Sequence, residues 1–287
     1  MQWRSRRSDP TDLAALHPGV PTWMLRPLVM WATAVMGMRK TNHGTLEGPY
    51  SPDPELLQEF ETATRRPRSL LSNLRQTAVQ GLYDAMGVDE FLDFIDFLVF
   101  HVERLGWQAS EFQDALEDLL RDAGSEWAVG DRDGHASLEK RVPEGVALAA
   151  TDIVASSGSA GTLLAEAWHA AFGRSPDAEE AYEKAIKAVE EAGYDKVSPK
   201  NAKATLGSMV RDMKVQRDWA IDFGPSHGNV AVQMAEALWV DQESRHGGNN
   251  YRKPTQAEAE AAVLLAVPLV QWFTSGAIAR RSDAPSV

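Results

Sequence analysis

The sequence predicts an all-α protein, mainly α with one small β-hairpin, that is built as two helical domains. Three observations lead to this prediction. Apolar residues recur at helical spacing along most of the 287 residues. Only the stretch 126–142 has the composition of paired strands around a turn. A small-residue joint, SSGSAG at 156–161, separates two groups of helical patterns. With 44% hydrophobic residues, the chain can bury a core in each domain.

The first half of the sequence predicts a helical domain at 21–150, which is preceded by a charged, proline-containing arm at 1–20. Residues 22–38 have the aliphatic and aromatic density of a buried helix, and Pro27 lies near its first turns, where a missing N–H is tolerated. Glycine and proline at 42–54 predict a loop. Amphipathic spacing predicts four further helices, at 54–64, 69–86, 88–105 and 110–122.

The predicted hairpin has strands at 126–129 and 137–142 around Asp131-Arg132-Asp133-Gly134, which are typical turn residues. Pro143 opens a further helix that extends to residue 155. We expect the domain boundary between Gly145 and Gly158.

The second domain is predicted at 151–281, followed by a short tail at 282–287. Its last helix has a well-defined start, because Thr255 and Glu258 form a capping-box pattern directly after Pro254. Amphipathic helices joined by short loops favour helix-on-helix packing. The predicted helices are 160–172, 177–192, 199–214, 228–244 and 255–280.

The formal net charge of −12 is unevenly distributed. Residues 84–122 carry eleven acidic side chains against two arginines, a local charge of −9, and should repel nucleic acid. Residues 196–217 reverse the balance, with six cations against Asp212, a local charge of +5. We therefore expect any contact with a polyanion at the helix predicted at 199–214.

Metal, nucleotide and thiol chemistry are not indicated. The chain contains no cysteine, which excludes disulfides, thiolate zinc sites and cysteine nucleophiles. Asp93 and Asp96 could pair on a metal, but no histidine lies at ligand spacing beside them, and we expect a solvated acidic helix face instead. The chain has no zincin, phosphate-loop or nucleophile-elbow motif. No cofactor and no metal are expected.

We expect a cytoplasmic protein without a membrane span. The basic N-terminus is followed by Asp9, Pro10 and Asp12 and not by the apolar core of a signal peptide. The most apolar runs, 28–38 and 261–273, are too short to cross a bilayer.

The candidate catalytic residues are Arg245 and His246, an adjacent pair just before Gly247 and Gly248. A histidine can titrate near neutral pH and an arginine can hold a phosphate, so this pair could handle a proton and an oxyanion. The alternative is a polar helix end, with cations opposing the negative C-terminal dipole.

Four segments of the second half resemble the C-terminal domain of abortive-infection proteins. This domain belongs to the HEPN-like group of helical domains in bacterial and phage defence, and the likeness is to an actinobacterial or phage version. It covers about 155–281 and implies a HEPN-like helical bundle that forms homodimers. The segments are AYEKAIKAVE at 181–190, SPKNAKATLGSMVRDM at 198–213, LWVDQESRHGG at 238–248 and TQAEAEAAVLLAVPLVQWF at 255–273.

Active HEPN domains cleave RNA without metal, through an arginine that precedes a histidine by a few residues. Here His246 matches the histidine, but Trp239, Val240 and Asp241 stand where the arginine is expected, and Arg245 is its direct neighbour. The resemblance therefore implies a noncatalytic or degenerate module of phage–bacterium conflict that dimerises and binds RNA or a protein partner. The alternative is a metal-independent endoribonuclease in which Arg245 and His246 act directly.

For either function, the expected RNA-binding residues are cations of the predicted helix and its start: Lys200, Lys203, Arg211 and Lys214. A further alternative removes this argument, because the same cations could instead pair with the acidic residues of 84–122 inside the chain.

Overall fold

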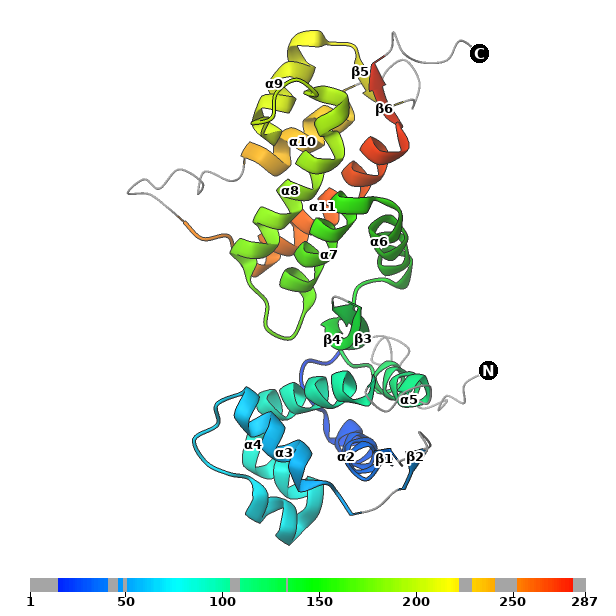
Figure 1. The fold of residues 1–287 in the computed structure, drawn as a ribbon, viewed down its shortest axis with the longest axis vertical. Helices are drawn as coiled ribbons and strands as arrows, with labels where there is room; N and C mark the ends of the chain where they lie inside the picture. The colour runs from blue at the N-terminus through cyan, green and yellow to red at the C-terminus, as the bar shows by residue number, and fades with distance from the viewer. Residues whose placement is uncertain are drawn as a thin grey trace. The chain divides into compact units, whose positions relative to one another are not determined.

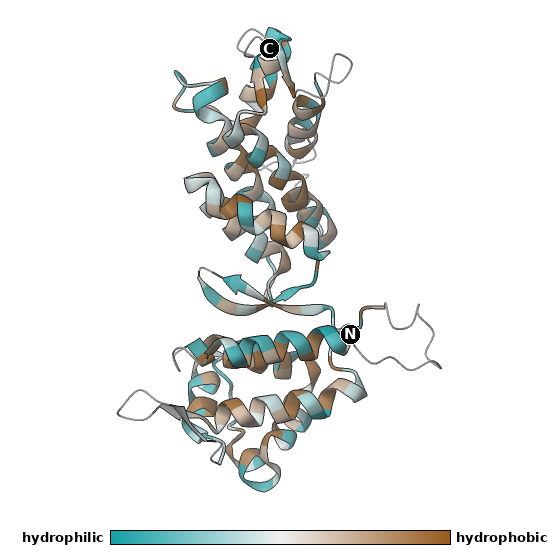
Figure 2. Cartoon of the chain, turned by 90° about the vertical axis from the view of Figure 1, so that its right-hand side faces the viewer, coloured by the Kyte–Doolittle hydropathy of each residue, from teal (hydrophilic) through white to brown (hydrophobic). Residues whose placement is uncertain are grey.

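The structure is a computed structural model, and it describes residues 15–40, 46–48, 51–103, 109–132, 134–221, 229–240 and 252–280. These residues form ten helices and three two-stranded antiparallel sheets, so the mainly α prediction is confirmed (Figure 1). The chain divides into two compact units, Met1–Arg141 and Val142–Val287, each with its own hydrophobic core. The division falls just before the predicted interval 145–158. In both units, the helices carry hydrophobic and hydrophilic residues interspersed along their length, as amphipathic helices do (Figure 2).

The first unit is a helical core with two small sheets. Its elements are α2 (Thr22–Met36), β1 (Arg39–Lys40), β2 (Leu46–Glu47), α3 (Pro54–Ala63), α4 (Leu71–Val102), α5 (Ala109–Asp122), β3 (Trp127–Arg132) and β4 (His135–Lys140). Helix α4 packs against α2, α3 and α5, and its aromatic residues Phe91 and Phe94 are fully buried. Part of the predicted arm also packs here, because His17 exchanges backbone hydrogen bonds with Gly124 and Glu126.

The long helix α4 is interrupted twice. The predicted break between 86 and 88 is present, since Gly87 adopts φ +75°, a value that favours glycine. A second interruption at Thr77 and Ala78 was not predicted from the sequence. Ala78 has φ +52° and ψ −149°, a conformation that an L-residue with a side chain rarely adopts.

The hairpin β3–β4 is longer toward its turn than predicted, with Arg132 opposite His135. Asp131 accepts a hydrogen bond from the N–H of Gly134 at 3.0 Å, as expected for a turn of this composition. Asp133 lies outside the described residues. The expectation of a solvated acidic face is wrong for Asp96, whose carboxylate accepts a hydrogen bond from Leu138 of β4.

The second unit is a helical bundle with one short sheet. Its elements are α6 (Glu144–Ser156), α7 (Gly158–Phe172), α8 (Ala178–Val197), α9 (Leu206–Gln216), β5 (Trp219–Ile221), α10 (Val230–Val240), α11 (Gln256–Ser275) and β6 (Ile278–Arg280). Helices α7, α8 and α11 pack against one another. Figure 1 shows α9, α10 and the β5–β6 pair gathered at one end of this unit.

Helix α11 has the length and hydropathy of a membrane span, and within the described part of the chain it alone does so. Its capping box is present as predicted, with Thr255 Oγ1 accepting from the N–H of Glu258. One side of α11 packs against α7 and α8. Eight of its side chains are buried in the core: Ala259, Ala262, Val263, Ala266, Val267, Leu269, Val270 and Phe273.

The prediction of a single hairpin is incomplete, because β1–β2 and β5–β6 are also antiparallel pairs. The last helix ends at Ser275 and not at residue 280, since Gly276 takes the left-handed conformation (φ +80°) that terminates helices. The three residues of β6 then pair with β5, which is distant in sequence.

Candidate nucleic-acid interface

The two candidate catalytic residues, Arg245 and His246, lie in 241–251, outside the described residues. The structure describes what precedes and follows this stretch. Helix α10 ends at Val240, and the chain is described again from Arg252, just before α11.

Side-chain interactions hold the chain on both sides of 241–251. On the α10 side, the hydroxyl of Tyr182 donates to the carbonyl of Leu238 at 3.3 Å. On the α11 side, Arg252 forms two hydrogen bonds with Glu258, at 2.8 and 2.9 Å. These bonds, with that from the N–H of Thr255, lower the pKa of Glu258 from 4.5 to about 2. The ends of this stretch are therefore attached to the bundle.

Two of the expected RNA-binding residues do not lie on a helix. The basic helix was predicted from 199, but α9 begins at Leu206, where Thr205 forms a capping box with Ser208. The preceding residues form turns, with Asn201 and Ala204 each donating a backbone hydrogen bond to a residue three positions earlier. Lys200 and Lys203 lie in this turn region and are exposed.

The other two, Arg211 and Lys214, lie on one face of α9 and line a groove of about 540 Å³. This face continues with Gly207, Val210 and Val215, which follow helical spacing. Arg217, at the end of α9, completes this side of the groove, and Glu236 and Trp239 of α10 line the opposite side. We call this the α9–α10 groove.

The α9–α10 groove carries three cations and one carboxylate. Lys214 forms an ion pair with Glu236, which joins α9 to α10. Arg211 contacts its neighbour Asp212 at 3.3 Å, but its side chain stays 71% exposed. Arg217 is exposed at the left-handed C-cap of α9. An anion could therefore reach Arg211 and Arg217 directly and compete with Glu236 for Lys214.

The indole ring of Trp239 approaches the backbone of α9 at Gly207. A Cβ atom at position 207 would overlap the ring atoms Cε2, Nε1 and Cζ2. Any side chain here would therefore displace the ring. The absence of a side chain allows α9 and α10 to approach closely at the groove.

Sequence reasoning identified Arg211 and Lys214 but assigned no role to Gly207, Glu236 or Trp239. The groove is formed by residues of two helices that are separated along the chain. The sequence of either helix alone therefore does not predict it. The i, i+3, i+4 spacing of Gly207, Val210 and Arg211 was the available signal for a shared face.

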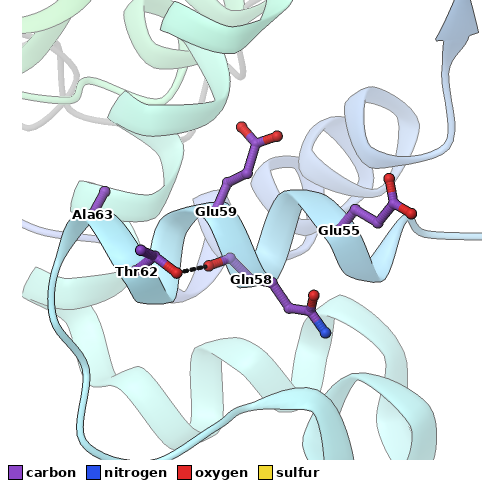
Figure 3. Close-up of a pocket in the computed structure, with 5 residues that line it drawn as sticks. All are labelled: Glu55, Gln58, Glu59, Thr62 and Ala63. Carbon is purple, nitrogen blue, oxygen red and sulfur yellow. Dashed lines mark hydrogen bonds between the residues drawn. The ribbon is translucent and has the colours of Figure 1, made fainter.

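The first unit has a different surface cavity, of about 470 Å³, along α3 (Figure 3). It is lined by Glu55, Gln58, Glu59, Thr62 and Ala63. Its charged groups are the carboxylates of Glu55 and Glu59, and it should repel a polyanion. Within the described ranges, no group of three or more histidine or carboxylate side chains is arranged to hold a metal ion.

Comparisons with protein-family models, with curated proteins and with solved structures found no match to this chain.

Proposed function

We propose that the second unit is a noncatalytic HEPN-like module of phage–bacterium conflict that binds RNA at the α9–α10 groove. The observation that carries this proposal is the lining of the groove, which combines the cations Arg211, Lys214 and Arg217 with the aromatic side chain of Trp239. Cations that follow a phosphate backbone, combined with an aromatic side chain, are the usual composition of single-stranded nucleic-acid sites. The nearby turn adds Lys200 and Lys203 as further exposed cations.

The test is the affinity of the purified protein for a labelled single-stranded RNA, measured by fluorescence anisotropy at low salt. Arg211→Ala and Arg217→Ala should each weaken binding about threefold or more, because each removes an exposed phosphate-binding cation. Lys187→Ala is the matched control, since Lys187 is an exposed α8 cation that pairs with Glu183. Equal affinities for wild type, Arg211→Ala and Arg217→Ala would refute RNA binding at the groove.

A substitution of Glu236 distinguishes an RNA partner from a positively charged protein partner. Glu236→Gln removes the carboxylate that holds Lys214 and should tighten RNA binding by up to about fivefold. A positively charged protein partner would bind this variant more weakly. If Glu236→Gln binds a positively charged protein more weakly and binds RNA no more tightly than the wild type, the partner of the module is a protein and not RNA.

The second candidate function is metal-independent cleavage of RNA by Arg245 and His246. It is carried by the resemblance, in which His246 matches the motif histidine and Arg245 is its direct neighbour. Arg245 follows Trp239 by six positions, and six residues of extended chain span at most about 20 Å. RNA bound in the groove would thus lie within reach of the pair.

Cleavage is tested by incubating the protein with a pool of tRNA and single-stranded RNA in the presence of a metal chelator. The ribonuclease candidate predicts products that disappear for His246→Ala. If no product forms, or if both proteins cleave equally, His246 is not catalytic and the binding module is retained.

Homodimer formation is part of the proposal, since the resemblance implies it. Sedimentation of the full chain over a range of concentrations measures it directly. A mass near twice 31.5 kDa is the expected result, and a monomer at all concentrations would remove this part of the proposal.

A further inference from the structure

The α9–α10 groove contains two apolar features that a phosphate site alone does not require. The indole of Trp239 forms part of its lining, and Val215 lies beside the cations with 75% of its surface exposed. Exposed apolar surface next to cations fits a ligand that has both an anionic and an apolar part. A nucleotide has this composition, with a flat base attached to a phosphate.

We infer that the α9–α10 groove binds one unstacked nucleobase of a single-stranded RNA against the indole of Trp239, with the neighbouring phosphates at Arg211 and Arg217. The inference rests on the proposed function. It specifies in addition that the RNA is single-stranded and that Trp239 is the residue that contacts the base. A base inside a duplex has both faces covered by its neighbours, so this site would take single strands.

The position of the indole is set by the bundle. Trp239 follows Leu238, whose side chain is 1% exposed in the core and whose carbonyl accepts the hydrogen bond from Tyr182. Gly207 supports the ring atoms on the α9 side. An aromatic side chain held in this way loses little conformational freedom when a base stacks on it.

The size of the groove agrees with this ligand. Its volume of about 540 Å³ lies in the range of roughly 300–1,000 Å³ that is usual for small-molecule sites, and a nucleotide belongs to this size class. The cations are placed to receive its phosphates, because Arg211, Lys214 and Arg217 line the same groove as the ring.

The test uses three labelled probes of equal length: an oligouridylate, an RNA duplex, and an abasic strand with the same ribose-phosphate backbone. The wild-type protein should bind the oligouridylate about tenfold more tightly than the abasic strand. Trp239→Leu should lower the ratio of the oligouridylate affinity to the abasic-strand affinity from about tenfold to near one, and Trp239→Phe should keep most of this ratio. Gly207→Ala should reproduce the loss through displacement of the ring.

Each outcome separates the inference from the proposed function. If Arg217→Ala weakens binding of all probes equally but Trp239→Leu changes none, the stacking inference is overturned and the RNA-binding function is retained. If no probe binds to the wild type, both are overturned. Tighter binding of the duplex than of the oligouridylate would also overturn the stacking inference. So would equal affinity for the oligouridylate and the abasic strand, if oligoglutamate, which has no base, displaces the oligouridylate. Circular dichroism and thermal melting verify that the variants are folded.

Discussion

The carboxylate of Asp96 on α4 accepts a hydrogen bond from the backbone N–H of Leu138 on β4, at 2.6 Å. In the observed register, Leu138 faces Val129 at a position where antiparallel strands do not exchange hydrogen bonds, so its N–H points away from the hairpin. Glu103 accepts a hydrogen bond from the N–H of Ala136 in the same way, and Glu117 accepts one from the N–H of Val129 at 2.9 Å. Carboxylates of α4, of its C-cap residue Glu103 and of α5 therefore accept hydrogen bonds along both edges of the two-stranded sheet.

Replacing Asp96 should destabilise the first unit. Asp96→Ala leaves the N–H of Leu138 without its acceptor and should lower the free energy of unfolding by about 1–3 kcal/mol. Asp96→Asn keeps an acceptor oxygen and should cost clearly less. Urea unfolding of both variants measures the difference. Equal losses for alanine and asparagine would mean that the charge, and not the hydrogen bond, matters here.

The interruption in α4 predicts a stabilising substitution. Ala78→Gly should raise the free energy of unfolding by about 1 kcal/mol, because glycine adopts the conformation of this residue without strain. Ala115→Gly, at an exposed interior position of α5, is the control and should lower stability by about 1 kcal/mol. A loss of stability in both variants would show that position 78 is not strained.

The start of α11 should contribute a pH-dependent part of stability. The pKa of Glu258 is lowered in the folded chain, so its contribution is fully present above about pH 4.5 and is lost as the pH falls toward about 2. Between these values, the melting temperature of the wild type should fall more steeply than that of Glu258→Gln. Arg252→Gln removes the same ion pair from its other side and should also flatten the profile. Parallel profiles for all three proteins would contradict this assignment.

The salt dependence of RNA binding should identify phosphate contacts. For single strands, each contact contributes about −0.7 to the slope of log K against log salt concentration. Arg211→Ala should therefore reduce the magnitude of the slope by about 0.7, whereas Lys187→Ala should leave it unchanged. An unchanged slope in Arg211→Ala would place this arginine outside the contact with the backbone.

Local chemistry explains which predictions succeeded. The capping box of Thr255 and Glu258 and the break at Gly87 depend on residues within one turn, so they could be read from the sequence. The start of α9 was misplaced, because Thr205 and Ser208 also form a capping box and the preceding lysines do not continue the helix. Asp96 was interpreted as a solvated side chain, since its acceptor role depends on a strand 42 positions away.

The amino-acid sequence by itself determined the helical class, the hairpin turn and the positions of the cations, because spacing, capping and turn chemistry act over a few residues. Only the tertiary structure decided that β5 pairs with β6 and that Gly207 and Trp239 meet in one groove. These pairs join segments that are distant along the chain. Their contact depends on how whole helices pack, which no local pattern of residues specifies.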